Sequence, residues 1–124
     1  METVAETAAY LAQAKAEGMT DAERTGVVDL LSANPTLGDL IRGSGGCRKV
    51  RIAGKGRGKS GGYRVVTFFG GRKMPVYLLA VLAKGSRANF SDAEVTAMEI
   101  IAGRIMAAHR VRRPGKTGEG VDDE

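Results

Sequence analysis

The amino-acid sequence predicts an α+β fold, in which two N-terminal helices and one C-terminal helix pack on a small antiparallel sheet. Three observations predict this fold. Apolar residues recur at helical spacing in both the first third and the last third of the chain. Between these thirds, side chains alternate in strand fashion on either side of a glycine-rich loop. A length of 124 residues fits one small domain.

The first third of the chain predicts a helical hairpin. Residues 2–6 fit either a short strand or the start of a helix. From Thr7 onward, alanine and leucine recur at helical spacing, and Gly18 is expected to end this helix.

A capping box of Thr20 and Glu23 predicts the start of the second helix. Asn34-Pro35 is expected to end it, because the residue before a proline avoids the helical region. The apolar residues of this helix are expected to face the core: Val27, Val28, Leu30, Leu31 and Ala33.

The middle of the chain predicts three consecutive strands. A loop at residues 38–46, anchored by Leu40 and Ile41, precedes the first strand. Period-2 alternation marks strands at residues 47–52 and 63–69, and the apolar run 76–83 is typical of a central strand covered on both faces. Short links between the strands predict an antiparallel meander.

The C-terminal helix is predicted to begin at a second capping box, formed by Ser91 and Glu94. Its apolar stripe is Val95, Met98, Ile101, Ala102, Ile105 and Met106. The helical pattern fades near His109, so we expect one domain over residues 1–109. Residues 110–124 lack apolar periodicity and are expected to be disordered.

Charge is strongly segregated along the chain. The net charge is +5, but residues 42–87 contain twelve Lys or Arg and no Asp or Glu, whereas residues 1–39 carry seven acids against two bases. This distribution favours a polyanionic partner such as nucleic acid. The longest apolar run has eight residues, too short to span a bilayer, and no signal peptide is apparent, so a cytoplasmic protein is predicted.

Two glycine patterns in the loop between the first two strands resemble nucleotide-binding motifs. Gly58-Lys59-Ser60 fits a relaxed phosphate-loop pattern, and Gly56-x-Gly58-x-x-Gly61 fits the dinucleotide fingerprint. Both motifs require a helix after the loop, whereas a strand is predicted there. We therefore interpret the loop as a flexible basic hairpin connection whose glycines allow close approach to phosphates.

The single cysteine and single histidine are interpreted as structural. Cys47 has no second cysteine or nearby histidine, so a buried thiol is expected rather than a metal ligand. His109 is expected to be solvated or to complement the dipole of a helix C-terminus, rather than to act in catalysis. No metal and no cofactor are predicted.

Several motifs follow one another in a recognisable order. They are Asn34-Pro35, Gly38-Asp39-Leu40-Ile41, Gly43-Ser44-Gly45-Gly46-Cys47-Arg48-Lys49-Val50-Arg51, Gly58-Lys59-Ser60-Gly61-Gly62-Tyr63-Arg64-Val65, Pro75-Val76-Tyr77-Leu78-Leu79, Ala83-Lys84 and Asn89-Phe90-Ser91-x-x-Glu94. This order resembles the RelE/HigB-like toxins, which belong to the RelE/ParE superfamily of type II toxin–antitoxin systems.

The resemblance implies a RelE-like microbial RNase fold, with residues 2–6 as an N-terminal strand. It also implies a ribosome-dependent mRNA endonuclease that a partner antitoxin neutralises, usually one with a helix-turn-helix domain. RNA cleavage of this type proceeds by attack of the ribose 2′-OH on the adjacent phosphate. The basic segment has no acid and no histidine, so we expect cations to do this work, with a tyrosine possible. A lysine becomes a usable base where neighbouring cations lower its pKa.

The resemblance also assigns roles to individual residues. Lys49 and Arg51 match basic positions of the catalytic strand, Arg64 matches the phosphate-stabilising arginine, and Lys84 matches the basic residue that ends the apolar strand. The alternative to a catalytic role for each cation is that it is a solvated surface residue of a generic RNA-binding sheet. Contacts with RNA are expected from a wider set: Arg48, Lys55, Arg57, Lys59, Tyr63, Tyr77 and Arg87.

The chain departs from the family pattern at two positions. Phe90 stands where some relatives have a catalytic tyrosine or histidine, and Gly85 stands where some have an arginine. The general acid is therefore open, with Tyr77 or Lys84 as candidates. These departures support an alternative function. The protein would then be a ParE-like toxin directed at DNA gyrase, or a decayed toxin that has lost its activity and binds nucleic acid without cutting it.

Overall fold

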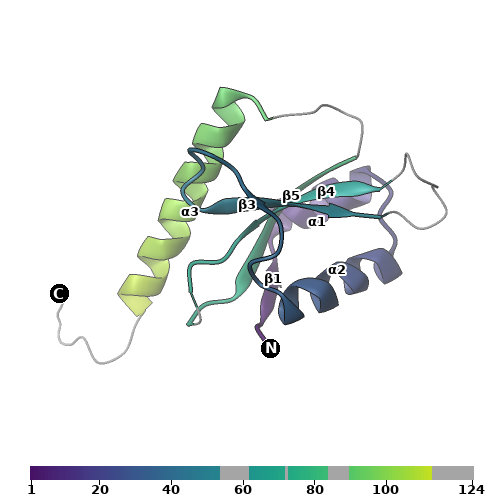
Figure 1. Ribbon diagram of the computed structural model, residues 1–124, viewed down its shortest axis with the longest axis horizontal. Helices are drawn as coiled ribbons and strands as arrows, with labels where there is room; N and C mark the ends of the chain where they lie inside the picture. The colour runs from purple at the N-terminus through teal and green to yellow at the C-terminus, as the bar shows by residue number, and fades with distance from the viewer. Residues whose placement is uncertain (54–61, 72, 84–89, 113–124) are drawn as a thin grey trace.

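A computed structural model describes residues 1–53, 62–71, 73–83 and 90–112 (Figure 1). Within these ranges the chain forms three helices and five strands, and this confirms the predicted α+β class. The helices are α1 (Ala8–Ala16), α2 (Asp21–Ala33) and α3 (Asp92–Arg112). The strands are β1 (Val4–Glu6), β2 (Asp39–Leu40), β3 (Cys47–Ile52), β4 (Tyr63–Phe68) and β5 (Val76–Ala83).

The strands form one sheet in the order β1-β5-β4-β3-β2. The predicted antiparallel meander of β3, β4 and β5 is confirmed. The prediction of a wholly antiparallel sheet is wrong, because β1 pairs with β5 in parallel, with Val4 opposite Val76. A short link fixes the relative direction of neighbouring strands, but β1 and β5 are separated by most of the chain.

The two-residue strand β2 forms where a loop was predicted. It pairs antiparallel with β3, and Ser44 holds the connection between the two strands. The Ser44 hydroxyl donates to the Ile41 carbonyl at 2.6 Å and accepts the Cys47 N–H at 2.9 Å. Two residues are too few to show alternation, so the sequence pattern contains no signal for this strand.

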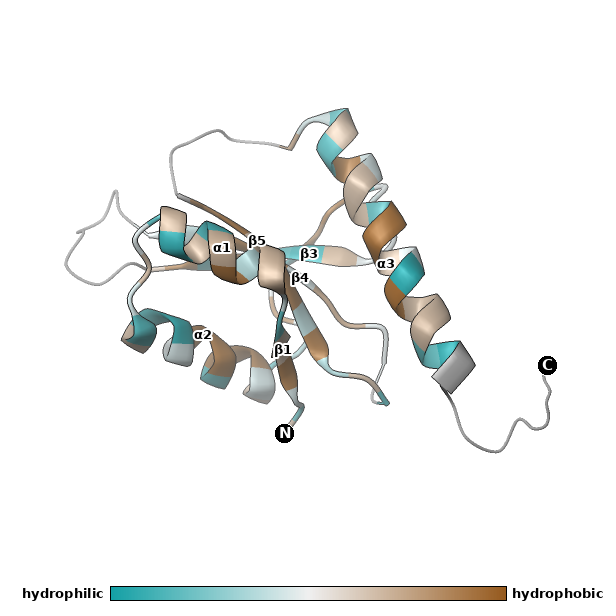
Figure 2. Ribbon diagram, turned by 180° about the vertical axis from the view of Figure 1, so that it is seen from behind, coloured by the Kyte–Doolittle hydropathy of each residue, from teal (hydrophilic) through white to brown (hydrophobic). Residues whose placement is uncertain are grey.

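The sheet separates two buried apolar clusters, with α1 and α2 on one face and α3 on the other (Figure 2). The larger cluster joins α1 and α2 to the sheet and includes Tyr10, Val27, Leu31, Val65 and Leu78. The smaller cluster lies beneath α3 and consists of Cys47, Val66, Phe68, Leu79, Met98 and Ala102. Alternate residues of a strand therefore contribute to different clusters, as Val65 and Val66 do on β4.

The two predicted capping boxes are both present. In the first, Glu23 Oε1 accepts the Thr20 N–H at 2.9 Å, and Thr20 Oγ1 accepts the Glu23 N–H at 3.0 Å. In the second, the reciprocal bonds between Ser91 and Glu94 measure 2.7 and 3.2 Å. These bonds satisfy backbone donors that a helix N-terminus leaves unpaired, so they fix where α2 and α3 begin.

Two details of the helices differ from the prediction. The C-terminal helix does not fade at His109 but continues to Arg112. The predicted core positions Leu30 and Ile101 are 38% and 40% exposed. Each helix packs on the sheet through a narrow stripe, and these two residues lie at its margin. None of the helices in the described ranges is long and apolar enough to cross a membrane.

Helix α1 covers the part of the β5 edge that β1 does not reach. β1 pairs with β5 only from Val76 to Leu78. Beyond this ladder, the Gln13 side-chain carbonyl accepts the Val81 N–H at 2.9 Å. The Thr7 hydroxyl donates to the Leu78 carbonyl at 2.7 Å. Side chains at and near α1 thus satisfy backbone groups that an edge strand otherwise exposes.

Candidate active site

Three of the predicted catalytic cations share one face of the sheet. Arg51 on β3 lies directly opposite Arg64 on β4, and Lys49 precedes Arg51 by two residues on the same face. Residues directly opposite each other in an antiparallel pair have Cβ atoms within about 5.5 Å. The structure therefore brings Lys49, Arg51 and Arg64 together, and we call the surface that they form the basic face.

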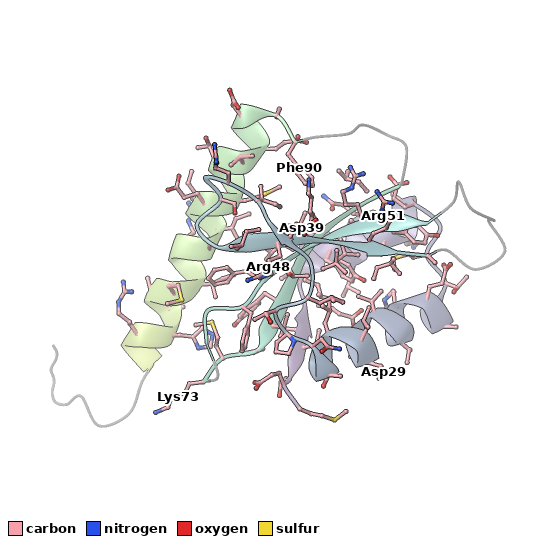
Figure 3. All side chains as sticks on the ribbon, viewed as in Figure 1. Asp29, Asp39, Arg48, Arg51, Lys73 and Phe90 are labelled. Atoms are coloured by element: carbon pink, nitrogen blue, oxygen red, sulfur yellow. The ribbon has the colours of Figure 1, made fainter. Side chains whose placement is uncertain are left out.

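The basic face lies on the side of the sheet that carries α3. Cys47 shares this face with Lys49 and is fully buried beneath α3, whereas Arg51 at the other end of β3 is exposed. Phe90, just before α3, is half-buried and packs against the cluster under that helix. In Figure 3 the side chains of Arg51 and Phe90 lie on the same side of the sheet. The cations thus emerge where the cover of α3 ends.

A carboxylate that the sequence interpretation overlooked also reaches this face. Asp39 on β2 lies directly opposite Lys49 on β3, and its side chain is exposed. Because Asp39 precedes the acid-free segment 42–87, the charge pattern gave no reason to include it. Its motif, Gly38-Asp39-Leu40-Ile41, was the available signal.

Arg48 lies on the opposite face of the sheet from Lys49. Its guanidinium Nη1 donates to the Gly38 carbonyl at 2.9 Å, and the side chain is partly buried. Figure 3 shows Arg48 below the sheet, away from Arg51. This contact ties β3 to the segment that leads into β2. We therefore assign Arg48 a structural role in place of the RNA contact predicted from the sequence.

Tyr63 is also turned away from the basic face. It is 1% exposed, lies in the cluster beneath α1 and α2, and its hydroxyl donates to Glu23 Oε1 at 3.3 Å. An RNA contact requires an accessible side chain, so burial argues against the predicted role. The alternation Tyr63, Arg64 identified two faces correctly but did not show which face α1 and α2 cover.

Tyr77 bonds with the one histidine of the chain. Its hydroxyl lies 2.8 Å from His109 Nε2, and the two rings meet edge to face with centroids 5.9 Å apart. His109 lies in the last turn of α3, as expected of a residue near a helix C-terminus, but its ring contacts Tyr77 of β5 instead of being fully solvated. The pair fastens the C-terminal part of α3 to the sheet.

One comparison with known proteins identifies the family. The model of the family described as the RelE toxin of the RelE/RelB toxin–antitoxin system matches residues 4–113. This match includes every helix and strand of the described structure. The chain belongs to the RelE toxin family. The resemblance inferred from the motifs is thereby confirmed, and membership of the RelE family implies that the natural partner is an antitoxin.

Five of the predicted RelE site residues lie outside the described ranges: Lys55, Arg57, Lys59, Lys84 and Arg87. The glycine loop that resembles nucleotide-binding motifs lies there too. Its flanks are described, however, and they are the antiparallel strands β3 and β4. A phosphate loop requires a helix after the glycines, so the flanks argue against nucleotide binding at this loop of the RelE chain.

The Cys47 thiol of this RelE chain is part of the packing beneath α3. It is fully buried, and its Sγ lies 4.0 Å from the Met98 carbonyl oxygen. Burial raises the pKa of the Cys47 thiol because it disfavours the thiolate, while a hydrogen bond with Ser44 acts in the opposite direction. These surroundings suit a structural thiol rather than a nucleophile.

Proposed function

We propose that this RelE-family toxin is a ribosome-dependent mRNA endonuclease that works without a metal ion. One observation carries the proposal: Arg51 and Arg64 lie opposite each other on neighbouring strands, with Lys49 on the same face. This arrangement supports binding of the scissile phosphate over the basic face. Such activity places the toxin in the cytoplasm, where ribosomes and mRNA are found.

The pairing of Arg51 with Arg64 favours an anionic ligand. Like charges directly opposite each other destabilise a sheet, and a bound phosphate removes that repulsion. Two guanidinium groups each offer parallel N–H donors that match phosphate oxygens. Lys49 adds a third positive charge two residues along β3.

The same cations support the chemistry of cleavage. Attack of the 2′-oxygen on phosphorus gives a phosphorane-like transition state with additional negative charge on its oxygens. Donors that are already in place stabilise this charge without reorganising. The products are a 2′,3′-cyclic phosphate and a free 5′-hydroxyl. The ribosome supplies much of the remaining catalysis by positioning the mRNA.

The partners follow from this activity. In the proposed system the antitoxin carries a helix-turn-helix domain, and acidic segments of the antitoxin cover the cations of the basic face. The ribosome and the mRNA in its A site are the targets of the free toxin.

The test is cleavage of mRNA on programmed ribosomes by the purified toxin. Arg64→Ala is expected to abolish cutting while the circular dichroism spectrum stays unchanged, since Arg64 is partly exposed on β4. Lys73→Ala is the matched control, because Lys73 is an exposed cation on the turn after β4, away from Arg51 (Figure 3). Cutting by Arg64→Ala at the wild-type rate would show that the proposed site is wrong.

Phe90 favours a second candidate function. It lies beside the basic face, and its side chain has no hydroxyl or imidazole that could donate a proton. A toxin that lacks this general acid fits a ParE-like poison of DNA gyrase or an inactive binding module. Intact mRNA together with gyrase-dependent DNA breaks in cells that express the toxin would favour the gyrase target. Intact mRNA without DNA breaks would favour the binding module.

A further inference from the structure

We propose that Asp39 is the general base of the cleavage reaction and accepts the proton of the attacking 2′-hydroxyl. This inference rests on the proposed endonuclease function and adds one residue to its site. The acid-free segment 42–87 contains no carboxylate and no histidine that could act as the base. The fold brings a carboxylate to that segment from a separate strand, at the position directly opposite Lys49.

The register of β2 and β3 gives the placement of Asp39. Because directly opposite residues of an antiparallel pair point to the same face, Asp39 and Lys49 project from one side of the sheet. Arg51 and Arg64 are the next pair along β3 on that side. The carboxylate therefore lies at the β2 edge of the basic face, on the same side of the sheet as the paired arginines. The proposal requires that the ribose beside a phosphate bound by these cations comes within reach of Asp39.

The backbone before Asp39 is held closely against β3, which fixes the side chain that follows. Gly38 has a φ of +99°, and a Cβ at that position would lie 2.5 Å from the Lys49 carbonyl oxygen. The Gly38 carbonyl in turn accepts the hydrogen bond from Arg48 at 2.9 Å. This close approach accounts for an ordered strand of only two residues. A catalytic group requires such a rigid position.

The two side chains divide the work between them. In the proposal the Asp39 carboxylate accepts the proton of the 2′-hydroxyl, and the Lys49 ammonium group donates hydrogen bonds to the phosphate. This division of roles gives the part of the base to a carboxylate, whereas the sequence interpretation left it to the cations, with a tyrosine possible.

Cleavage is an internal transesterification of the RNA. The 2′-O–H bond breaks, its proton passes to the Asp39 carboxylate, and the 2′-oxygen forms a bond to phosphorus. The bond between phosphorus and the 5′-oxygen breaks, and that oxygen leaves with the electron pair and takes a proton from water. Asp39 then returns its proton to water. Nothing is oxidised or reduced.

The charge of Asp39 gives the proposal a distinctive test. A carboxylate repels RNA phosphates, so its removal is expected to strengthen binding or leave it unchanged. A base is needed for the chemical step, so its removal is expected to slow cleavage. No purely structural role for Asp39 predicts these opposite effects.

The experiment measures single-turnover cleavage of mRNA on programmed ribosomes and, separately, binding to ribosomes that carry mRNA with a 2′-O-methyl group at the cleavage site. The cleavage rate of Asp39→Asn is expected to fall by about 100-fold or more, as for loss of a general base. Its affinity for the uncleavable complex is expected to equal or exceed that of the wild type. Asp39→Glu is expected to recover part of the rate. The matched control is Asp29→Asn, an exposed carboxylate on α2 away from the basic face (Figure 3).

Each other outcome overturns the assignment. Asp39→Asn that cuts at the wild-type rate shows that Asp39 is not the base. Parallel loss of rate and binding, in both Asp39→Asn and Asp39→Glu, shows that Asp39 supports the structure of β2. If the wild-type toxin itself leaves mRNA intact, the endonuclease function fails and the assignment fails with it, whereas the first two outcomes leave that function standing.

Discussion

Arg51 and Arg64 lie directly opposite each other on β3 and β4, on the face of the sheet that carries α3. A sheet places two like charges in this relationship at some loss of stability. The free energy of unfolding and the activity of the toxin are therefore expected to respond in opposite directions to changes at this pair.

Arg51→Thr is expected to raise the free energy of unfolding by about 0.2–1 kcal/mol, because it removes the cross-strand repulsion and places a good strand former on β3. The same variant is expected to lose most of its cleavage of mRNA on ribosomes. Urea unfolding and the cleavage assay measure the two effects. A fall in stability would show that the two guanidinium groups do not repel each other in the free toxin.

Tyr63→Phe tests the burial of a residue that the sequence placed in the RNA interface. Loss of the hydroxyl that bonds Glu23 is expected to lower the free energy of unfolding by about 0.5–1.5 kcal/mol. Cleavage is expected to stay near the wild-type rate, since the ring lies under α1 and α2. A large loss of RNA binding at unchanged stability would restore Tyr63 to the interface.

Tyr10 predicts a decline of stability at alkaline pH. Burial raises the pKa of Tyr10 to about 12, with the Glu6 carboxylate adding to the shift and the Arg24 guanidinium opposing it. The unfolded chain releases this proton near pH 10, whereas the folded chain holds it. The contribution is therefore fully present below about pH 10 and is lost as the pH rises toward 12, by up to about 3 kcal/mol.

The measurement compares wild type with Tyr10→Phe in urea unfolding between pH 8 and 12, a range chosen to span about two units around the ordinary tyrosine pKa. The stability difference between the two proteins is expected to stay constant at the lower end and to shift in favour of Tyr10→Phe above about pH 10. Parallel curves throughout would contradict the raised pKa.

Tyr77→Phe tests how α3 is fastened to the sheet. The variant removes the 2.8 Å bond with His109 but keeps the aromatic ring. Amide hydrogen exchange over residues 105–112 is expected to become faster, while exchange in α1 and α2 stays unchanged because those helices belong to the other cluster. Equal exchange in both proteins would show that apolar packing alone holds this end of α3.

The sequence predicted those parts of the fold that depend on local patterns. The capping boxes at Thr20 and Ser91 and the alternation on β3 and β4 act over a few residues, so one chain suffices to detect them. The parallel direction of β1 and the existence of β2 depend on pairing between distant segments. No local sequence pattern indicates such pairing, and a strand of two or three residues is too short to show the alternation that predicts strands.

The candidate site was predictable to the same extent. Alternation placed Lys49 and Arg51 on one face, and the register then brought Arg64 opposite Arg51. Alternation also placed Arg48 and Tyr63 on the other side, but it did not show that this side packs beneath α1 and α2. Asp39 was missed because it reaches Lys49 through pairing of a strand that was not foreseen.

The burial of Cys47 beneath α3 makes its thiol a natural probe for the opening of this part of the toxin. Cys47 is the single cysteine of the chain, and Met98 and Ala102 of α3 belong to the cluster that buries it. Because Sγ is fully buried beneath α3, the rate at which a thiol reagent labels it is expected to report openings of this cluster, such as lifting of α3 from the sheet. The natural sequence thus allows the motion of α3 to be timed without an engineered probe, in the free toxin and in its complexes.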